Sequence, residues 1–191
     1  WRPSLRAALC GRLQVFAYGQ TGTGKTHTME GDLKSDEEKG VIPRAVHDLF
    51  QVLSTASAEG TSAVVTCSYL QIYNDRLFDL LADRRRRKPL VMREQERNRK
   101  REVFVSGLAE YRVANAEDVM LLLQVGSANR AVRGTDANDM SSRSHALLQL
   151  GVEVEINQDG GSTVIRRAKL NLVDLAGSEK WNTRVEMTKD H

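Results

Sequence analysis

The sequence predicts an α/β fold, a three-layer sandwich in which helices flank a central mixed, mostly parallel sheet. Two observations favour this class. Strand-like and helix-like segments alternate along the 191 residues. In addition, the glycine-rich stretch Gly19–Thr26 separates an apolar run from a helix-compatible segment, and this strand–loop–helix arrangement occurs in many α/β folds. With 40% hydrophobic residues, a chain of this length can bury one sizeable core.

The first elements follow from apolar periodicity. Leu13–Tyr18 is an apolar run without proline or aspartate, which predicts a buried strand. Lys25–Glu30 can open a helix, and Gly31–Gly40 is a polar loop. Val41–Leu53 has a helical apolar stripe, and Pro43 near its start suits the first turn of a helix.

The middle of the chain mixes β-branched and charged segments. Ala63–Tyr73 is rich in β-branched and aromatic residues, which predicts a strand. The stretch after it contains a short amphipathic turn at Leu77–Leu81. A strongly basic segment follows, and we expect only one brief strand within it, at Val103–Val105.

The last elements have the clearest patterns. Ala116–Val132 is predicted to be a helix that is capped near Asn115 and carries acidic residues in its first turn. Ala146–Ile156 alternates apolar and polar residues, and the turn at Asn157–Gly161 should pair it with Thr163–Leu170 as a hairpin.

Composition excludes several classes of protein. No apolar run is long enough to span a bilayer as a helix. Two cysteines, Cys10 and Cys67, cannot make a disulfide framework, and their apolar surroundings favour buried thiols over a metal site. Because the chain starts at Trp1 and not at a methionine, we expect it to be an internal piece of a longer protein.

Gly19–Thr26 reads GQTGTGKT and matches the phosphate-binding pattern G-x-x-x-x-G-K-[ST]. The glycines let backbone N–H groups close around phosphate oxygens, Lys25 can reach the β and γ phosphates, and the Thr26 hydroxyl can ligate Mg²⁺. The alternative is a turn that is merely rich in glycine and threonine. With its flanking strand and helix, the stretch predicts binding of a nucleoside triphosphate and the fold of P-loop NTPases.

Two further segments contain polar groups that suit a triphosphate site. Asp174 ends an apolar strand and Gly177 follows three residues later, so the pair could hold a Mg²⁺-bound water and offer a backbone N–H to the γ-phosphate. Asn138–His145 offers hydroxyls, a guanidinium and an imidazole on one flexible loop, as a loop that senses a γ-phosphate would need. Taken alone, the two segments could be an ordinary strand-ending turn and a serine-rich surface loop.

Basic residues are concentrated in one segment. Between Arg84 and Arg101 there are ten basic and two acidic residues, whereas the rest of the chain is net acidic. This charge separation predicts a polyanionic partner, either an acidic protein surface, nucleic acid or a membrane face, although a solvated loop would show the same composition. Nucleic acid is disfavoured, because no aromatic residue lies among these basic positions to stack on bases.

Three stretches together resemble the kinesin motor domain. YGQTGTGKTHTM (Tyr18–Met29), NDMSSRSH (Asn138–His145) and DLAGSE (Asp174–Glu179) are similar to its phosphate loop, switch I and switch II, in that order. Connecting stretches agree, among them GVIPRAVHDLF from Gly40 and GSANRAV from Gly126. The resemblance covers the chain from about residue 5 to about residue 180.

The resemblance implies ATP as ligand and Mg²⁺ as cofactor. Thr26 and Ser142 would ligate the metal ion, and Asp174 would hold it through a water molecule. The implied nucleotide contacts are Tyr18, Gly19, Gln20, Thr21, Gly22, Thr23, Gly24, Lys25, Thr26 and His27.

The implied catalytic groups lie in the two switches. Ser141 would position the attacking water or relay its proton, and Ser142 would complete the metal site. The Gly177 amide would sense the γ-phosphate. Arg143 and Glu179 would form a salt bridge that closes the switches over the nucleotide, and Glu179 would also help to polarise the water.

The resemblance also implies partners and extent. Microtubules would be the acidic partner, with no role for nucleic acid or a membrane. The full-length protein would be a cytoplasmic, cytoskeletal motor, with a homodimer as its candidate assembly. We expect 1–191 to be part of a motor domain that lacks the N-terminal strand, the switch II helix, later microtubule-binding elements and the neck linker. The implied microtubule contacts are Arg84, Arg85, Arg86, Arg87, Lys88, Arg97, Arg99 and Arg101.

Two alternatives remain open. One is a kinesin-like module that binds microtubules without hydrolysing ATP, which the intact Lys25, Thr26 and Asp174 disfavour. The other is a GTPase-type switch protein, since that class shares the phosphate loop and the D-x-x-G pattern. The guanine-binding signature N-K-x-D does not occur in the sequence.

Overall fold

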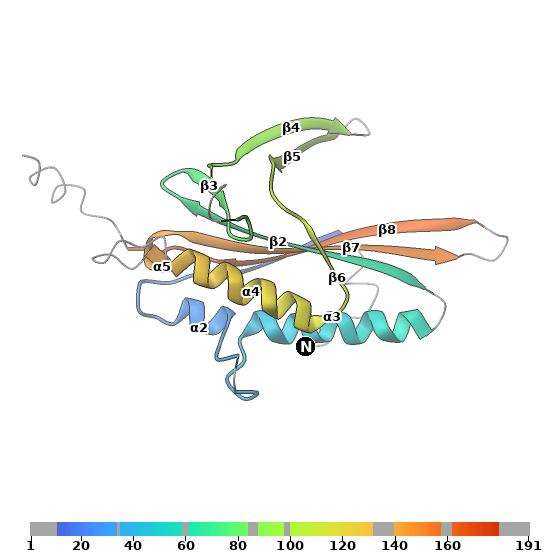
Figure 1. Ribbon diagram of the computed structural model, residues 1–191, viewed down its shortest axis with the longest axis horizontal. Coiled ribbons are helices and arrows are strands. Elements are labelled where there is room, and N and C mark those ends of the chain that lie inside the picture. Colours follow the sequence, from blue (N-terminus) through green and yellow to red (C-terminus); the bar gives the residue numbers. More distant parts are fainter. Residues whose placement is uncertain are drawn as a thin grey trace, which may run out of the picture.

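The computed structural model describes residues 11–33, 35–58, 61–83, 88–97, 100–131, 140–157 and 162–179. The elements along the chain are β1 (Gly11–Ala17), α2 (Lys25–Met29), α3 (Val41–Ala58), β2 (Ser62–Tyr73), β3 (Arg76–Asp79), β4 (Val91–Arg97), β5 (Lys100–Ser106), β6 (Tyr111–Val113), α4 (Ala116–Ala131), α5 (Met140–Arg143), β7 (His145–Asn157) and β8 (Thr163–Asp174) (Figure 1). Six strands form one sheet in the order β1, β8, β7, β2, β3, with β6 beside β2, and β4 and β5 form a second sheet.

The main sheet is mixed, as expected. β1 and β8 run parallel, with Ala17 opposite Asp174 at their carboxyl ends. The other pairings, β8 with β7, β7 with β2, β2 with β3 and β2 with β6, are antiparallel. The expectation of a mostly parallel sheet is therefore wrong for the described strands. The reason is that β7–β8 and β2–β3 are consecutive strands with short connections, and such strands pair antiparallel.

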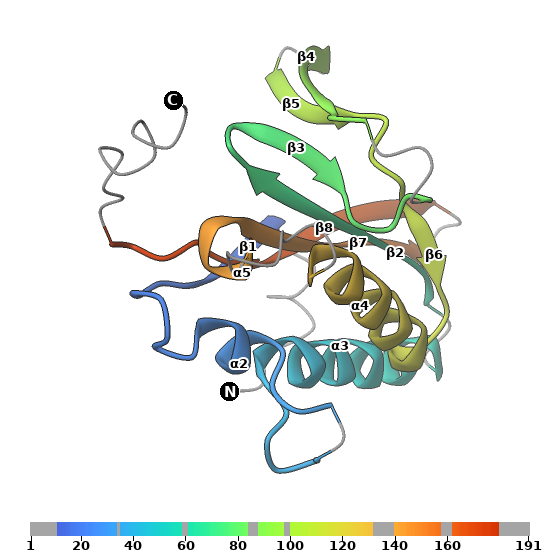
Figure 2. The same ribbon diagram turned by 60° about the vertical axis from the view of Figure 1, so that its left-hand side comes forward.

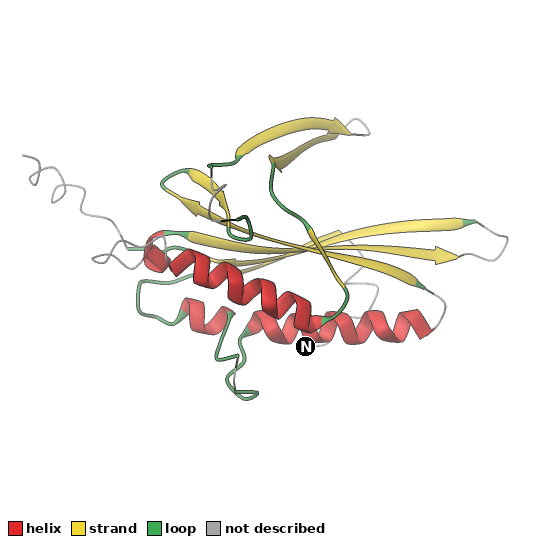
Figure 3. Cartoon of the chain, in the orientation of Figure 1, coloured by secondary structure: helices red, strands yellow, loops and turns green. Residues whose placement is uncertain are grey.

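Helices pack against the sheet, as predicted, but those described lie together on one face, so the second helical layer of the expected three-layer sandwich is not among the described residues (Figures 1 and 3). Figures 1 and 3 show α2, α3 and α4 on that face, whereas the β4–β5 hairpin lies on the opposite side. Apolar side chains of α3, α4, β2 and β7 fill the space between the helices and the sheet. Buried members of this core are Ile42, Val46, Leu53, Val65, Tyr69, Val119, Leu123, Leu148 and Leu150.

Two sequence expectations about the edges of the sheet are corrected. The strand predicted at Leu13–Tyr18 exists as β1, but it is not buried, since Phe16 is 54% exposed. Among the described strands, β1 pairs only with β8 and so forms an edge. The amphipathic turn expected at Leu77–Leu81 is instead strand β3, because Asn74 and Asp75 adopt positive φ and turn the chain back onto β2.

The basic segment forms a hairpin, where we expected only a brief strand. β4 pairs with β5 along its whole length, from Val91 opposite Ser106 to Arg97 opposite Lys100. Figure 2 shows the hairpin standing apart from the main sheet, next to β3. A single bridge between Leu77 and Leu90 joins its base to the end of β3.

Helix α4 begins where the sequence predicts. The Asn115 side chain accepts a hydrogen bond from the Asp118 N–H, and the Asp118 carboxylate accepts one from the Ala114 N–H. Such reciprocal bonds satisfy backbone donors that have no partner at a helix N-terminus. Cys67 is buried as expected, whereas Cys10 lies outside the described residues. None of the described helices combines the length and the apolar character that crossing a bilayer requires.

Candidate functional site

The phosphate-binding loop lies between β1 and α2, where the sequence predicts it. Gly22 and Gly24 have φ of 83° and 85°, a left-handed conformation that residues with a Cβ rarely adopt. Gly24 directly precedes the first residue of α2. The loop therefore has the backbone shape that its glycines were expected to allow.

Bonds within the loop hold it together. The Thr23 hydroxyl and Lys25 Nζ both donate to the Gln20 carbonyl, each at 2.8 Å. The Gly19 carbonyl accepts from the Ser178 N–H at 3.1 Å, which ties the loop to the segment after β8. Tyr18 is 77% exposed, and His27 is exposed as well, so both side chains are accessible beside the loop.

Thr26 and Asp174 meet across the carboxyl ends of β1 and β8. The Thr26 hydroxyl donates to Asp174 Oδ2 at 2.7 Å. The parallel register that places Ala17 opposite Asp174 explains this contact, because the loop leaves β1 at the level where β8 ends. Asp174 is buried, and its second oxygen, Oδ1, has no hydrogen-bond partner among the described residues.

These two residues fit a Mg²⁺ ion. Since the Thr26 hydroxyl gives its proton to Asp174, its oxygen lone pairs remain available to a cation. The unpaired Asp174 Oδ1 can accept a hydrogen bond from a metal-bound water. The described residues form no cluster of three or more His, Cys, Asp or Glu able to hold a metal, so a bound Mg²⁺ would need oxygens of the nucleotide and water as well.

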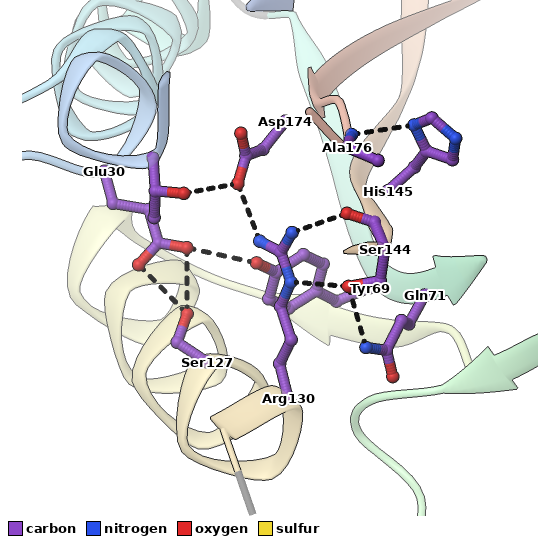
Figure 4. Close-up of polar contacts among 10 residues, drawn as sticks. Glu30, Tyr69, Gln71, Ser127, Arg130, Ser144, His145, Asp174 and Ala176 are labelled. Atoms are coloured by element: carbon purple, nitrogen blue, oxygen red, sulfur yellow. Dashed lines mark hydrogen bonds and ion pairs between the residues drawn. The ribbon is translucent and has the colours of Figure 1, made fainter. Parts of the chain in front are cut away.

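Arg130 is a central site residue to which sequence reasoning gave no role. Its Nη1 donates to Asp174 Oδ2 at 2.7 Å, and its Nη2 donates to the Ser144 carbonyl at 2.8 Å (Figure 4). Its Nε donates to the Ser144 hydroxyl at 3.3 Å, which also accepts from Gln71 Nε2 at 3.0 Å. A signal was present in the sequence, because Arg130 continues the buried stripe of α4 that runs through Val119 and Leu123.

Glu30 is a partly buried acidic group beside the site. It follows α2 directly, and its carboxylate accepts from the Ser127 hydroxyl at 3.0 Å and the Tyr69 hydroxyl at 3.2 Å. Burial raises the pKa of Glu30, although these hydrogen bonds and the Arg130 charge oppose the increase. The same helix, α4, therefore contacts the end of α2 through Ser127 and the end of β8 through Arg130 (Figure 4).

The two predicted switch segments touch each other. The Gly177 N–H donates to the Ser142 carbonyl at 2.8 Å, and the Ala176 N–H donates to His145 Nδ1 at 3.0 Å. The serine-rich stretch was expected to be a flexible loop, but its end forms the short helix α5, which includes Ser141. Serine, asparagine and aspartate favour caps and turns over helix interiors, which fits a helix of only four residues here.

Glu179 has a different partner from the expected one. The sequence suggested a salt bridge with Arg143, but one Glu179 oxygen accepts from the Thr21 N–H at 2.9 Å and the other accepts from the Thr21 hydroxyl. These bonds lower the pKa of Glu179, with a smaller contribution from Lys25. The Ser178 N–H donates to the Gly19 carbonyl, so residues 178 and 179 both bond the phosphate loop.

The expected basic contacts are only partly described. Lys88 and Arg101 are exposed, and Arg97 ends β4. Arg84, Arg85, Arg86, Arg87 and Arg99 lie outside the described residues. Hence the structure places part of the basic segment on the β4–β5 hairpin.

The fold and site define a class, the phosphate-loop proteins that combine a strand–loop–helix unit with an aspartate at the end of the neighbouring parallel strand. The kinesin motor domain model matches residues 2–191. The chain belongs to the kinesin motor domain family.

Relatives and solved structures agree with this family. Kinesin-related protein 5 of Dictyostelium discoideum is 43% identical over 171 residues, which cover 87% of this chain and 16% of that protein. Kinesin-like protein KIN-8A of Oryza sativa subsp. japonica is 45% identical over 166 residues, with 87% and 20% covered. A solved structure of a fast kinesin superposes with a TM-score of 0.75 at 37% identity and covers 90% of this chain and 46% of that one. The chain thus spans about a fifth or less of the length of these two relatives.

Proposed function

We propose that this chain forms the ATP-binding and ATP-hydrolysing core of a microtubule motor protein. One observation carries the proposal: the phosphate loop, the end of β8 and the end of the serine-rich stretch converge at one edge of the sheet. Thr26 bonds Asp174 there at 2.7 Å, and the Gly177 N–H bonds the Ser142 carbonyl at 2.8 Å. The fast kinesin structure, which is described in terms of its ATPase mechanism and interactions with microtubules, supports this assignment.

Binding of the triphosphate would rest on the loop. Backbone N–H groups of residues 19–26 would surround the phosphates, and Lys25 Nζ would exchange its bond with the Gln20 carbonyl for a phosphate oxygen. Thr26 and Ser142 would hold Mg²⁺, and Asp174 would accept a hydrogen bond from its water shell. When bound, the ion neutralises phosphate charge and orients the transferring group. Tyr18 and His27 would lie along the nucleotide.

Sensing of the γ-phosphate would rest on the contact between the two switch segments. Since the Gly177 N–H bonds the Ser142 carbonyl, a ligand that moves either segment must also move or release the other. Glu179 would leave Thr21 and pair with Arg143 when the switches close, and Ser141 would then position the attacking water. A surface ion pair of this kind contributes little stability, but it can bias a two-state loop.

The partner would be the acidic surface of microtubules. Lys88 and Arg101 are exposed at the β4–β5 hairpin, and the neighbouring Arg84–Arg87, Arg97 and Arg99 add to the positive charge of the segment. Long-range attraction of this type is sensitive to salt. A microtubule-bound, cytoplasmic location of the full-length protein follows from this proposal.

The test is phosphate release by the full-length protein. We expect release from ATP to accelerate when microtubules are added, and ATP to displace a fluorescent nucleotide more effectively than GTP. The variant Lys25→Ala should lose the release. Tight nucleotide binding without microtubule-stimulated release would instead indicate a binding module, and preference for GTP would indicate a GTPase-type switch.

A further inference from the structure

Helix α4 carries Arg130, whose buried guanidinium lies at the centre of the site. Arg130 is 3% exposed, and Asp174, its ion-pair partner, is 4% exposed. A buried ion pair is weak evidence for stability, because the cost of removing both charges from water offsets most of their attraction. The pair therefore needs another explanation, and the arrangement of its hydrogen bonds offers one.

The two oxygens of Asp174 differ in their hydrogen bonds. Arg130 Nη1 and the Thr26 hydroxyl both donate a hydrogen bond to Oδ2, each at 2.7 Å. Oδ1 is buried and has no partner within the part of the chain that the structure describes. Rotation of the carboxylate would break two short bonds, both charge-assisted because the acceptor is an ionised carboxylate, so Arg130 and Thr26 together fix the orientation in which Oδ1 stays available.

The remaining donors of Arg130 hold a second segment. Nη2 donates to the Ser144 carbonyl, and Nε donates to the Ser144 hydroxyl. Ser144 lies between α5 and β7. The planar guanidinium thus fixes the end of β8 relative to the end of the serine-rich stretch (Figure 4). A lysine could keep the charge but could not bond both segments in one plane.

We infer that Arg130 is a positioning residue for the metal site: it orients Asp174 so that Oδ1 accepts from the water shell of a nucleotide-bound Mg²⁺, and it keeps Ser142 close by through Ser144. This inference rests on the proposed nucleotide function. Outer partners of metal-binding groups typically contribute about 10- to 100-fold to metal affinity.

The test is the Mg²⁺ requirement of nucleotide binding in the full-length protein. Binding of a fluorescent ATP analogue is titrated with Mg²⁺, and binding in EDTA is measured separately. Arg130→Lys should raise the half-saturating Mg²⁺ concentration about tenfold and leave affinity in EDTA unchanged. Ser144→Ala, which removes one bond each of Arg130 and Gln71 with little loss of volume, should shift the requirement in the same direction by less than Arg130→Lys does.

Ser127→Ala is the matched control, because Ser127 lies about one helical turn from Arg130 and its hydroxyl donates to Glu30 rather than to Asp174. It should leave the Mg²⁺ requirement unchanged. If Arg130→Lys and Ser144→Ala bind Mg²⁺-nucleotide as the unmodified protein does, the positioning role is wrong while the proposed function stands. If the unmodified protein itself shows no Mg²⁺-dependent nucleotide binding, both the positioning role and the proposed function are wrong.

Discussion

Thr26 and Asp174 are 148 positions apart in the chain, yet the Thr26 hydroxyl donates to Asp174 Oδ2 at 2.7 Å. The contact exists because β1 and β8 are parallel neighbours whose last residues, Ala17 and Asp174, lie opposite each other. Carboxyl ends of adjacent parallel strands are where α/β folds gather ligand-binding groups. The proposed nucleotide site follows from this single register.

The buried pair of Arg130 and Asp174 should be much more sensitive to disruption than a surface pair. Asp174→Asn keeps the shape but leaves the guanidinium without its countercharge, so we expect a loss of about 3–5 kcal/mol in unfolding free energy, measured by urea denaturation. The exposed pair of Arg167 and Glu153 provides the control, because Glu153→Gln should cost less than about 1 kcal/mol. Equal losses in the two variants would contradict this account of the buried pair.

Gly126 should resist substitution although it lies within a helix. A Cβ at this position would lie 2.1 Å from Tyr69 Cδ1, so the ring would have to move away from Glu30. Alanine normally stabilises a helix relative to glycine, but here we expect Gly126→Ala to lower unfolding free energy by about 1–3 kcal/mol. The neighbouring exposed Val125→Ala should change it by less than about 0.5 kcal/mol. A more stable Gly126→Ala protein would show that the ring yields freely.

Glu30 should make stability fall as pH rises. Its folded-state pKa lies above the usual 4.5, chiefly because of burial, so the folded protein binds the proton more strongly than the unfolded chain. The resulting stabilisation is complete below about pH 4.5 and is lost as pH rises through the raised pKa. We therefore expect Glu30→Gln to gain unfolding free energy relative to the unmodified protein as pH increases. A difference that stays constant with pH, in urea titrations at several pH values, would contradict the assignment.

Much of the fold was predictable because its signals are local. The phosphate loop, the hairpin that ends at Asp174 and helix α4 with its Asn115 cap each follow from a short stretch of sequence. Pairing direction was not, since it depends on which strands the fold brings together. For this reason the expectations of a mostly parallel sheet and of a buried β1 were wrong for the described strands.

The sequence named the residues of the candidate site one by one but not the network of contacts among them. Residues of the loop and of both switch segments do converge, as Thr26 with Asp174 and Gly177 with Ser142 show. The contacts of Arg130 were missed because a lone arginine on a helix is usually solvated, although its place on the apolar stripe of α4 was a signal that it could be buried. The Glu179 contact with Thr21 likewise depends on how close two distant loops lie.

The basic hairpin should control attachment to microtubules. Replacing Lys88 and Arg101 with alanine removes two exposed charges, so co-sedimentation should need more microtubules and should lose part of its salt dependence. Arg166→Ala, which removes an exposed charge from β8, is the control and should change neither. If co-sedimentation of the variant at Lys88 and Arg101 depends on salt as strongly as that of the unmodified protein, the microtubule contact lies elsewhere on the molecule.

The most direct test of the account is microtubule-stimulated phosphate release by full-length protein carrying Thr26→Ala, because Thr26 joins the phosphate loop to Asp174. We predict that the unmodified protein releases phosphate from ATP faster when microtubules are added, and that Thr26→Ala loses this release at millimolar Mg²⁺ while remaining folded. Release by Thr26→Ala at the rate of the unmodified protein would contradict the assignment of the site.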